Sequence, residues 1–290
     1  MNCLFITNRI KQDIKLISLL YLFVIIITNS CTNYNPYYNC YSISNGLSFE
    51  LPLDTISHNR FTIDNKIYKG NSKYKITYVF LDKHSNQFYF KKNGRDWLFV
   101  SKDSIDEKTI YSLSLTILDN FGPFEKEQSW YNQSVIKYEY LNVNGKILYT
   151  EHTGLVENEK NIWFHPPRYG LFRILQLNPF PYIHFPAKKR MNWDWSLEVG
   201  SAWGDNRWIM WDSLITLNSY YSVNENEMLI INDNENVSCK VITGASISEI
   251  GTTYLKSFFR KDYGFVKFEY QNIDSSRIIF NITKNNDFNN

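Results

Sequence analysis

The feature that most constrains this chain is a period-two alternation of apolar and polar residues. In residues 73–81 (KYKITYVFL), aromatic and aliphatic side chains alternate with lysine and threonine, and residues 109–118 and 135–141 follow the same pattern. Successive side chains of a β-strand point to opposite faces, so this period predicts strands with one buried face and one wet face. Aromatic residues form 17% of the chain, which also favours half-buried strands.

Turn residues separate these segments. Asn93-Gly94 and Asn144-Gly145 lie between apolar runs, and both residue types accept the positive φ angles of two-residue hairpin turns. Adjacent strands are therefore predicted to be antiparallel. Residues 170–177 are the stretch in which a short helix is expected, and few or no long helices are predicted. The fold class is all-β, as a curved antiparallel sheet or unclosed β-barrel, with two packed sheets as the alternative.

Residues 1–30 have the features of a cleavable bacterial signal peptide. Three basic residues at positions 9–15 precede the run 16–27, which is apolar except for Ser18. A membrane-spanning helix needs about 20 apolar residues, whereas signal cores have about 7 to 15. The length favours cleavage, and an uncleaved N-terminal anchor is the alternative.

Residues 28–31 (TNSC) resemble the lipobox of bacterial lipoproteins, in which a small residue precedes a cysteine that receives diacylglycerol. Ser30 and Cys31 match this motif, whereas the Thr and Asn before them depart from it. The resemblance implies that Cys31 is lipidated and attaches the mature chain to a membrane, with residues 31–44 as the lipidated cysteine and tether. No acidic run follows Cys31, which favours the periplasmic side of the outer membrane.

The charge balance of the mature chain disfavours a nucleic-acid partner. Without residues 1–30, the chain has 28 basic and 28 acidic residues, so it lacks the positive footprint that nucleic acids require. Residues 45–284 are predicted to form the all-β domain, followed by a disordered tail, 285–290. The proline-rich segment within 154–190 is a candidate internal boundary, although both halves can also belong to a single sheet.

Two cysteines of the mature chain have no role in lipidation. Cys40 and Cys239 can form a disulfide in an oxidising periplasm. Alternatively, Cys239 is an inert buried thiol, because Val237 and Val241 share its strand face. Two distant cysteines do not indicate a metal site, and no metal is predicted.

Residues 191–212 (MNWDWSLEVGSAWGDNRWIMWD) concentrate five of the eight tryptophans. These candidate ligand-binding residues are Trp193, Trp195, Trp203, Trp208 and Trp211. One interpretation is an exposed aromatic platform for sugars or acyl chains. The other is a hydrophobic core, since large rings bury much area when they pack across sheets.

The same segment holds four acidic residues, which a glycosidase would need in a close pair. Asp194 and Glu198 share one strand face, but four strand steps put their backbones about 13 Å apart. Asp205 and Asp212 are expected to be turn residues.

No catalytic motif accompanies these carboxylates. His165 has a distinctive setting, WFHPPR, yet the chain has no GxSxG, HExxH, CxxC or glycine-rich phosphate loop. The chain is therefore predicted not to be an enzyme and to use no cofactor.

The C-terminal region carries a resemblance to known proteins. Cys239, Gly251-Thr252-Thr253, and the segments DYGFVKFEY and SRIIFNI are similar to the end of uncharacterised Gram-negative outer-membrane and periplasmic lipoproteins. The sheets of those proteins are related to the Lol-like half-barrel of lipoprotein carriers and receptors. The likeness covers about 50 residues and implies a fold and a location, not an activity.

Three functional hypotheses follow. The first is a non-enzymatic cell-envelope lipoprotein that binds a hydrophobic ligand, such as a lipid, or an envelope-protein partner on an aromatic sheet surface. The second is glycan binding by the tryptophan segment 193–211. The third is a structural or assembly role in which every aromatic residue belongs to the core or to a subunit contact.

Overall fold

The structure is a computed structural model that describes residues 38–43, 47–52, 65–119, 133–231 and 235–284. The predicted signal peptide, Cys31 and the tail 285–290 lie outside these residues. The strands are β1 (Tyr38–Ile43), β2 (Leu47–Pro52), β3 (Lys73–Leu81), β4 (Gln87–Asn93), β5 (Asp96–Val100), β6 (Thr109–Ile110), β7 (Ser112–Ile117), β8 (Ser134–Leu141), β9 (Ile147–Glu157), β10 (Asn161–Phe164), β11 (Tyr182–His184), β12 (Asn192–Val199), β13 (Ile215–Val223), β14 (Glu227–Ile231), β15 (Glu235–Ser248), β16 (Gly251–Arg260), β17 (Gly264–Gln271) and β18 (Arg277–Lys284). Short 3-10 helices are η2 (Lys102–Ser104), η4 (Gly170–Leu177) and η5 (Ser201–Trp203). Over the described ranges, no helix has the length and apolarity needed to span a membrane.

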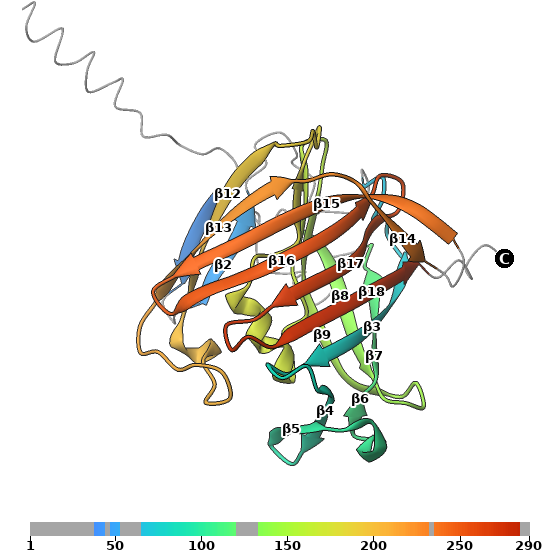
Figure 1. Ribbon diagram of the computed structural model, residues 1–290, viewed down its shortest axis with the longest axis vertical. Helices are drawn as coiled ribbons and strands as arrows, with labels where there is room; N and C mark the ends of the chain where they lie inside the picture. The colour runs from blue at the N-terminus through green and yellow to red at the C-terminus, as the bar shows by residue number, and fades with distance from the viewer. Residues whose placement is uncertain (1–37, 44–46, 53–64, 120–132, 232–234, 285–290) are drawn as a thin grey trace, which may run out of the picture. The chain divides into compact units, whose positions relative to one another are not determined.

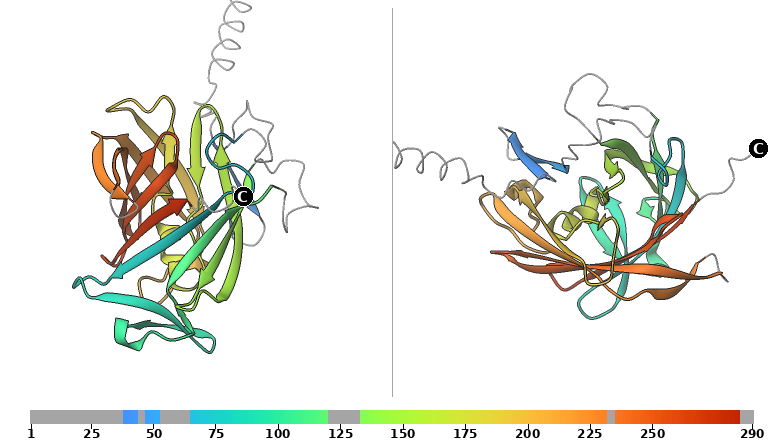
Figure 2. Two further views of the ribbon diagram at one scale, coloured as in Figure 1. Left: turned by 90° about the vertical axis from the view of Figure 1, so that its right-hand side faces the viewer. Right: turned by 90° about the horizontal axis from the view of Figure 1, so that it is seen from above.

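A single antiparallel sheet organises the domain (Figure 1). Its strand order is β11-β10-β9-β8-β7-β3-β18-β17-β16-β15-β13-β12, and the sheet curls into a nearly closed barrel with an unsealed seam. The curl is visible in the right view of Figure 2. Strands from both sides of the proline-rich segment belong to this sheet. The predicted all-β class and unclosed barrel are confirmed.

The alternation of the sequence sets which side chains face inward. Along β3, the buried side chains are Tyr74, Ile76, Tyr78 and Phe80, and the residues between them are more exposed to solvent. β7 departs from the prediction, because Tyr111 lies just before the strand and is 44% exposed. Alternation over residues 109–118 predicts that Tyr111 shares the buried face of Leu113, Leu115 and Ile117. Those three residues are buried, but Tyr111 is not, so its predicted position is wrong.

Aromatic side chains and η4 fill the inside of the sheet. Phe172 of η4 lies with its ring centroid 5.1 Å from Tyr78, 4.7 Å from Phe90 and 5.7 Å from Phe280. These partners come from three different strands, so the helix is at the centre of the main core. Thr253 Oγ1 ties the helix end to β16 by donating to the Leu177 carbonyl at 2.7 Å.

Both predicted hairpins are present. β4 pairs with β5, and the register Asn93↔Asp96 places Gly94 and Arg95 in the turn, one residue later than expected. β8 pairs with β9 around Gly145, whose φ of +75° explains the glycine.

A bulge in the pairing of β16 with β17, between Phe258 and Phe259, creates a second small core. Val266 packs there with Phe258, Cys239 and neighbouring valines on the outer side of the sheet. Alternation in the sequence predicts that Val266 shares one buried face with Phe268 and Tyr270. This prediction is wrong, because the bulge shifts the alternation by one residue.

Polar contacts attach the segment before β3 to the sheet. Glu157 accepts hydrogen bonds from the backbone N–H groups of residues 66, 67 and 68, each at 2.8 Å. Tyr68 is 1% exposed, and its hydroxyl accepts a hydrogen bond from Phe265 N at 2.8 Å. The Tyr68 side chain therefore closes one end of the core against β17.

Candidate functional site

The tryptophan segment lies largely in the core. Trp193, Trp195 and Trp211 are 9%, 3% and 8% exposed, whereas Trp203 and Trp208 are half-buried. An exposed platform made of all five rings is therefore not present. For the three buried rings, the core interpretation holds, because β12 turns Trp193 and Trp195 toward the inside of the sheet.

These inward rings close the seam between the two ends of the sheet. β11 and β12 are the terminal strands of the order and do not pair with each other. Trp193 stacks on His184 of β11 with centroids 4.9 Å apart. Trp195 lies 5.9 Å from Trp163 and 5.3 Å from Phe180. Ring packing thus takes the place of backbone pairing at the seam.

His184 makes the seam sensitive to pH. Burial lowers the pKa of His184 from 6.5 to about 4, and its Nε2 lies 2.5 Å from the Tyr182 hydroxyl. The unfolded chain binds this proton more readily, so the contribution to stability is complete above pH 6.5 and is lost as the pH falls toward 4. The free energy of unfolding is measured by urea denaturation at each pH. Between pH 6.5 and 4, we expect it to decrease by about 2–3 kcal/mol less in His184→Gln than in the wild type. An unchanged slope in the variant would contradict this assignment.

The acidic residues of the segment do not converge. Asp194 is paired with Tyr220 and Glu198 with Thr216 in the register of β12 and β13, so both carboxylates lie on the outer face, four residues apart. Asp205 is a turn residue, as expected: its carboxylate accepts hydrogen bonds from Arg207 N at 3.0 Å and Nε at 2.7 Å. The Arg207 guanidinium holds the pKa of Asp205 below its usual range despite an opposing effect of burial.

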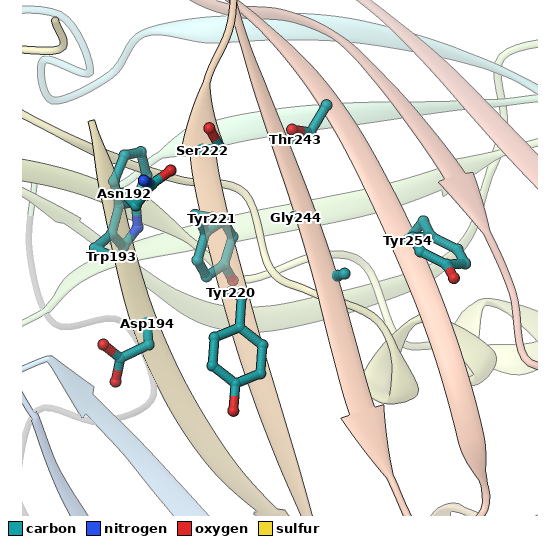
Figure 3. A pocket seen from close by; sticks show the side chains of 10 residues that line it. Asn192, Trp193, Asp194, Tyr220, Tyr221, Ser222, Thr243, Gly244 and Tyr254 are labelled. Carbon is teal, nitrogen blue, oxygen red and sulfur yellow. The ribbon is translucent and has the colours of Figure 1, made fainter. Parts of the chain in front are cut away.

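The outer face of the same strands carries a shallow groove of about 560 Å³ (Figure 3). Tyr220 of β13 and Tyr254 of β16 flank it and are 54% and 47% exposed. Ala245 of β15 lies between them, because it pairs with Tyr220 on one side and Tyr254 on the other. The two tyrosines therefore stand two strand spacings apart, about 9.5 Å, above a methyl group. Asn192 and Asp194 border the groove at β12.

The sequence contains a signal for this groove in the alternation of β13 and β16. In 215–223, alternation buries Ile215, Leu217 and Tyr221, which leaves Tyr220 on the polar face. Tyr254 has the same position in β16, between buried Thr253 and Leu255. A large aromatic residue on the wet face of a strand is the recognisable feature.

His165 belongs to a buried polar network. It is 5% exposed, and its Nδ1 lies 2.8 Å from the Pro166 carbonyl oxygen. Arg168 Nε donates to Glu151 Oε1 at 2.8 Å, and Glu151 also accepts from the Tyr140 hydroxyl at 2.5 Å. Burial lowers the pKa of His165, with nearby Arg168 adding to the effect. The network stabilises the turn after β10 and leaves His165 enclosed.

Only one cysteine of the candidate disulfide, Cys239, has a described side chain. Cys239 is a buried free thiol, and burial raises its pKa. The side chain of Cys40 lies outside the described side chains. Within the described part of the chain, no three His, Cys, Asp or Glu side chains come together in a geometry that holds a metal ion.

The fold and the groove define an all-β protein with an open barrel-like sheet and an aromatic outer face. No protein-family model and no curated protein match the chain. Three solved structures resemble it at low identity. The first is the hypothetical lipoprotein YmcC from Escherichia coli (K12), at 14% identity and TM-score 0.30, covering 76% of this chain and 89% of that one.

The second is a predicted exported protein with a YmcC-like fold from Bacteroides fragilis, at 10% identity and TM-score 0.36, covering 75% and 98% of the two chains. The third is a predicted lipoprotein from Parabacteroides distasonis, at 11% identity and TM-score 0.34, covering 74% and 95%. These TM-scores carry no argument about function. The resemblance to Lol-like half-barrels stays a prediction.

Proposed function

We propose that this protein is a non-enzymatic cell-envelope lipoprotein that binds a hydrophobic ligand or an envelope-protein partner on the outer aromatic face of its sheet. The observation that carries the proposal is the position of Tyr220 and Tyr254, which are exposed on either side of Ala245. An exposed ring on a polar strand face costs solubility and contributes little to folding, so a pair of them marks a contact surface.

The filled interior directs the proposal to the outer face. Phe172, Phe90 and Tyr78 occupy the centre of the sheet and are 4% exposed or less. An acyl chain entering this core would displace packed rings, each of which contributes several kcal/mol to stability. A ligand at the groove needs no such rearrangement, because the space is already open to solvent.

A non-enzymatic role agrees with the arrangement of the charged groups. Glycoside hydrolysis requires two carboxyl groups within about 9.5 Å, whereas Asp194 and Glu198 lie four strand steps apart. Asp205 is held by Arg207, and Glu151 is held by Arg168. These carboxylates are committed to structural contacts or isolated on the outer face.

Glycan binding is the second candidate, with the groove between Tyr220 and Tyr254 as its site and the start of the tryptophan segment at the border. A flat ring between two aromatic faces needs about 7–8 Å, which the spacing of Tyr220 and Tyr254 accommodates. Asp194 and Asn192 at the border offer hydrogen-bond groups for hydroxyls.

The proposed lipid anchor at Cys31 is tested by mass spectrometry and by membrane fractionation. Mass spectrometry of protein extracted from membranes is expected to show a diacylglyceryl mass on Cys31, and Cys31→Ser is expected to remove it and release the chain from the membrane fraction. An unmodified Cys31 in membrane-bound protein would contradict the proposed anchor.

The groove is tested by native mass spectrometry of gently purified protein. A ligand or partner is expected to copurify with the wild type and with Cys31→Ser, and to be reduced at least tenfold in Tyr220→Ala/Tyr254→Ala. Tyr111→Ala is the matched control, since this tyrosine is 44% exposed, close to the 47% of Tyr254, and lies outside the groove. A bound mass unchanged by the double variant, or no bound mass at all, would reject the groove as the binding site. The bound mass also decides between glycan, lipid and protein.

A further inference from the structure

The groove between Tyr220 and Tyr254 continues past Tyr254 across the outer face of the sheet. A second hollow of about 330 Å³ lies beyond this tyrosine and reaches Arg277 of β18. The two hollows share Thr243, Gly244 and Tyr254 in their linings. They therefore form one continuous depression, here called the channel.

The strand register explains the shape of the channel. Residues directly opposite one another in antiparallel strands share a face of the sheet. Successive pairs connect one outward row across six strands, which consists of Asp194, Tyr220, Ala245, Tyr254, Gln271 and Arg277. This row is the first wall of the channel and contains both tyrosines of the groove.

The second wall is the outward row two residues away along each strand, a separation of about 7 Å. It consists of Asn192, Ser222, Thr243, Lys256, Glu269 and Ile279. Between the walls lie residues that face the core, such as Tyr221 and Gly244, so their backbone forms the floor (Figure 3). The channel runs perpendicular to the strands, and five strand spacings give it a length of about 24 Å.

The positive charge of Arg277 is not neutralised at its end of the channel. Lys256 Nζ lies 2.9 Å from Glu227 Oε1, and Glu269 is paired with a lysine of its own strand. Arg277 is exposed, and its Nη2 donates to the uncharged Ser85 Oγ at 3.3 Å. Among the residues that the structure describes, no carboxylate lies within 4 Å of the Arg277 guanidinium. This end of the channel is therefore suited to an anionic group.

We propose that the channel binds a linear acidic oligosaccharide, which lies across the strands with a carboxylate at Arg277. A guanidinium and a carboxylate form strong, paired, charge-assisted hydrogen bonds. Asp194 at the opposite end of the channel repels an anionic group there, so the two end charges set the direction of the bound chain. This inference deepens the glycan candidate of the proposed function and rests on the same groove.

The walls of the channel suit a sugar chain better than an acyl chain. They combine two tyrosine rings with hydroxyl, amide and charged side chains. A tyrosine ring covers the apolar face of a sugar, while the polar side chains donate hydrogen bonds to sugar hydroxyls and accept hydrogen bonds from them. An acyl chain in the same place would cover these polar groups without offering them hydrogen bonds.

An extended peptide is also a poor match for the channel. Peptides bind to sheets by pairing their backbone with an exposed strand edge. The middle of the floor is formed by β13, β15, β16 and β17, and each of these strands pairs with a neighbour on both sides. Their backbone groups are therefore already used within the sheet, and recognition at the channel depends on the side chains of the walls.

The test measures the affinity of the purified protein for oligogalacturonate, oligomannuronate and hyaluronan fragments by isothermal titration calorimetry. Malto-oligosaccharides of the same lengths are the neutral reference. We expect at least one acidic series to bind, with an affinity that rises at least tenfold from two sugar units to six, because only the longer chain extends from the groove to Arg277. Arg277→Gln is expected to lower the affinity for the long acidic chain at least tenfold.

The matched control is Arg95→Gln, which removes the same charge from an exposed arginine outside the channel. This variant is expected to bind the acidic chain as the wild type does. The proposal would be overturned if no acidic series binds, if the affinity does not depend on chain length, or if the two arginine variants lose affinity equally.

Failure of the channel is distinguishable from failure of the groove. If Tyr220→Ala/Tyr254→Ala loses the copurifying ligand while Arg277→Gln retains it fully, the groove stands and the channel is rejected. A lipid or a protein as the copurifying ligand would also keep the groove and overturn the assignment to an acidic oligosaccharide. If the tyrosine variant retains the ligand as well, both proposals fail.

Discussion

Trp195→Ala is expected to lower the free energy of unfolding by about 3–5 kcal/mol, as is typical when a large buried ring is removed. Trp195 is 3% exposed and packs against Trp163 and Phe180. The loss is expected to be near the upper limit, because these contacts cross the seam, where no backbone hydrogen bonds between β11 and β12 support the sheet. Urea denaturation followed by circular dichroism measures the change.

Trp203→Ala is the control, because Trp203 is half-buried and lies in the same segment. We expect a loss of about 1 kcal/mol, mainly from its contacts with Arg168 and Arg173. Similar small losses for both variants would show that Trp195 does not close the seam. A ligand-dependent effect of Trp195→Ala without a loss of stability would instead support the binding interpretation of this ring.

Gly264→Ala is expected to cost about 3 kcal/mol of unfolding free energy. Gly264 has a φ of +95°, which side chains rarely adopt. An added Cβ would lie 2.4 Å from the Tyr68 hydroxyl oxygen, well inside van der Waals contact. The same hydroxyl accepts the hydrogen bond from Phe265 N, so relief of the clash breaks a buried contact.

Two further variants separate backbone strain from the clash. Gly145 has a φ of +75°, and no atom lies within 4 Å of an added Cβ. Gly145→Ala is therefore expected to lower the free energy of unfolding by only about 1 kcal/mol. A double-mutant cycle tests the contact between the two residues. Tyr68→Phe is expected to lower the free energy of unfolding by at least about 1 kcal/mol less in the Gly264→Ala background than in the wild type. Additive losses would mean that Tyr68 and Gly264 do not interact as the structure indicates.

The candidate site was only partly predictable. Alternation correctly placed Asp194 and Glu198 on one strand face, and Asp205 in a turn. It also defined Tyr220 as an outward residue. The groove, however, needs Tyr220, Ala245 and Tyr254 to come together from three strands. Alternation specifies the face of each residue but not the register between strands, so the sequence pattern alone does not bring these residues into a row.

The sequence by itself determined the strands, the hairpins at Gly94 and Gly145, and the all-β class. These depend on local properties, namely a period of two and the positive φ of glycine. Only the tertiary structure decided that β3 pairs with β18, about 200 residues later, and that Trp193 and Trp195 close a seam. Pairing between distant strands depends on the total burial of both sheet faces, which is a property of the whole chain and not of any one segment.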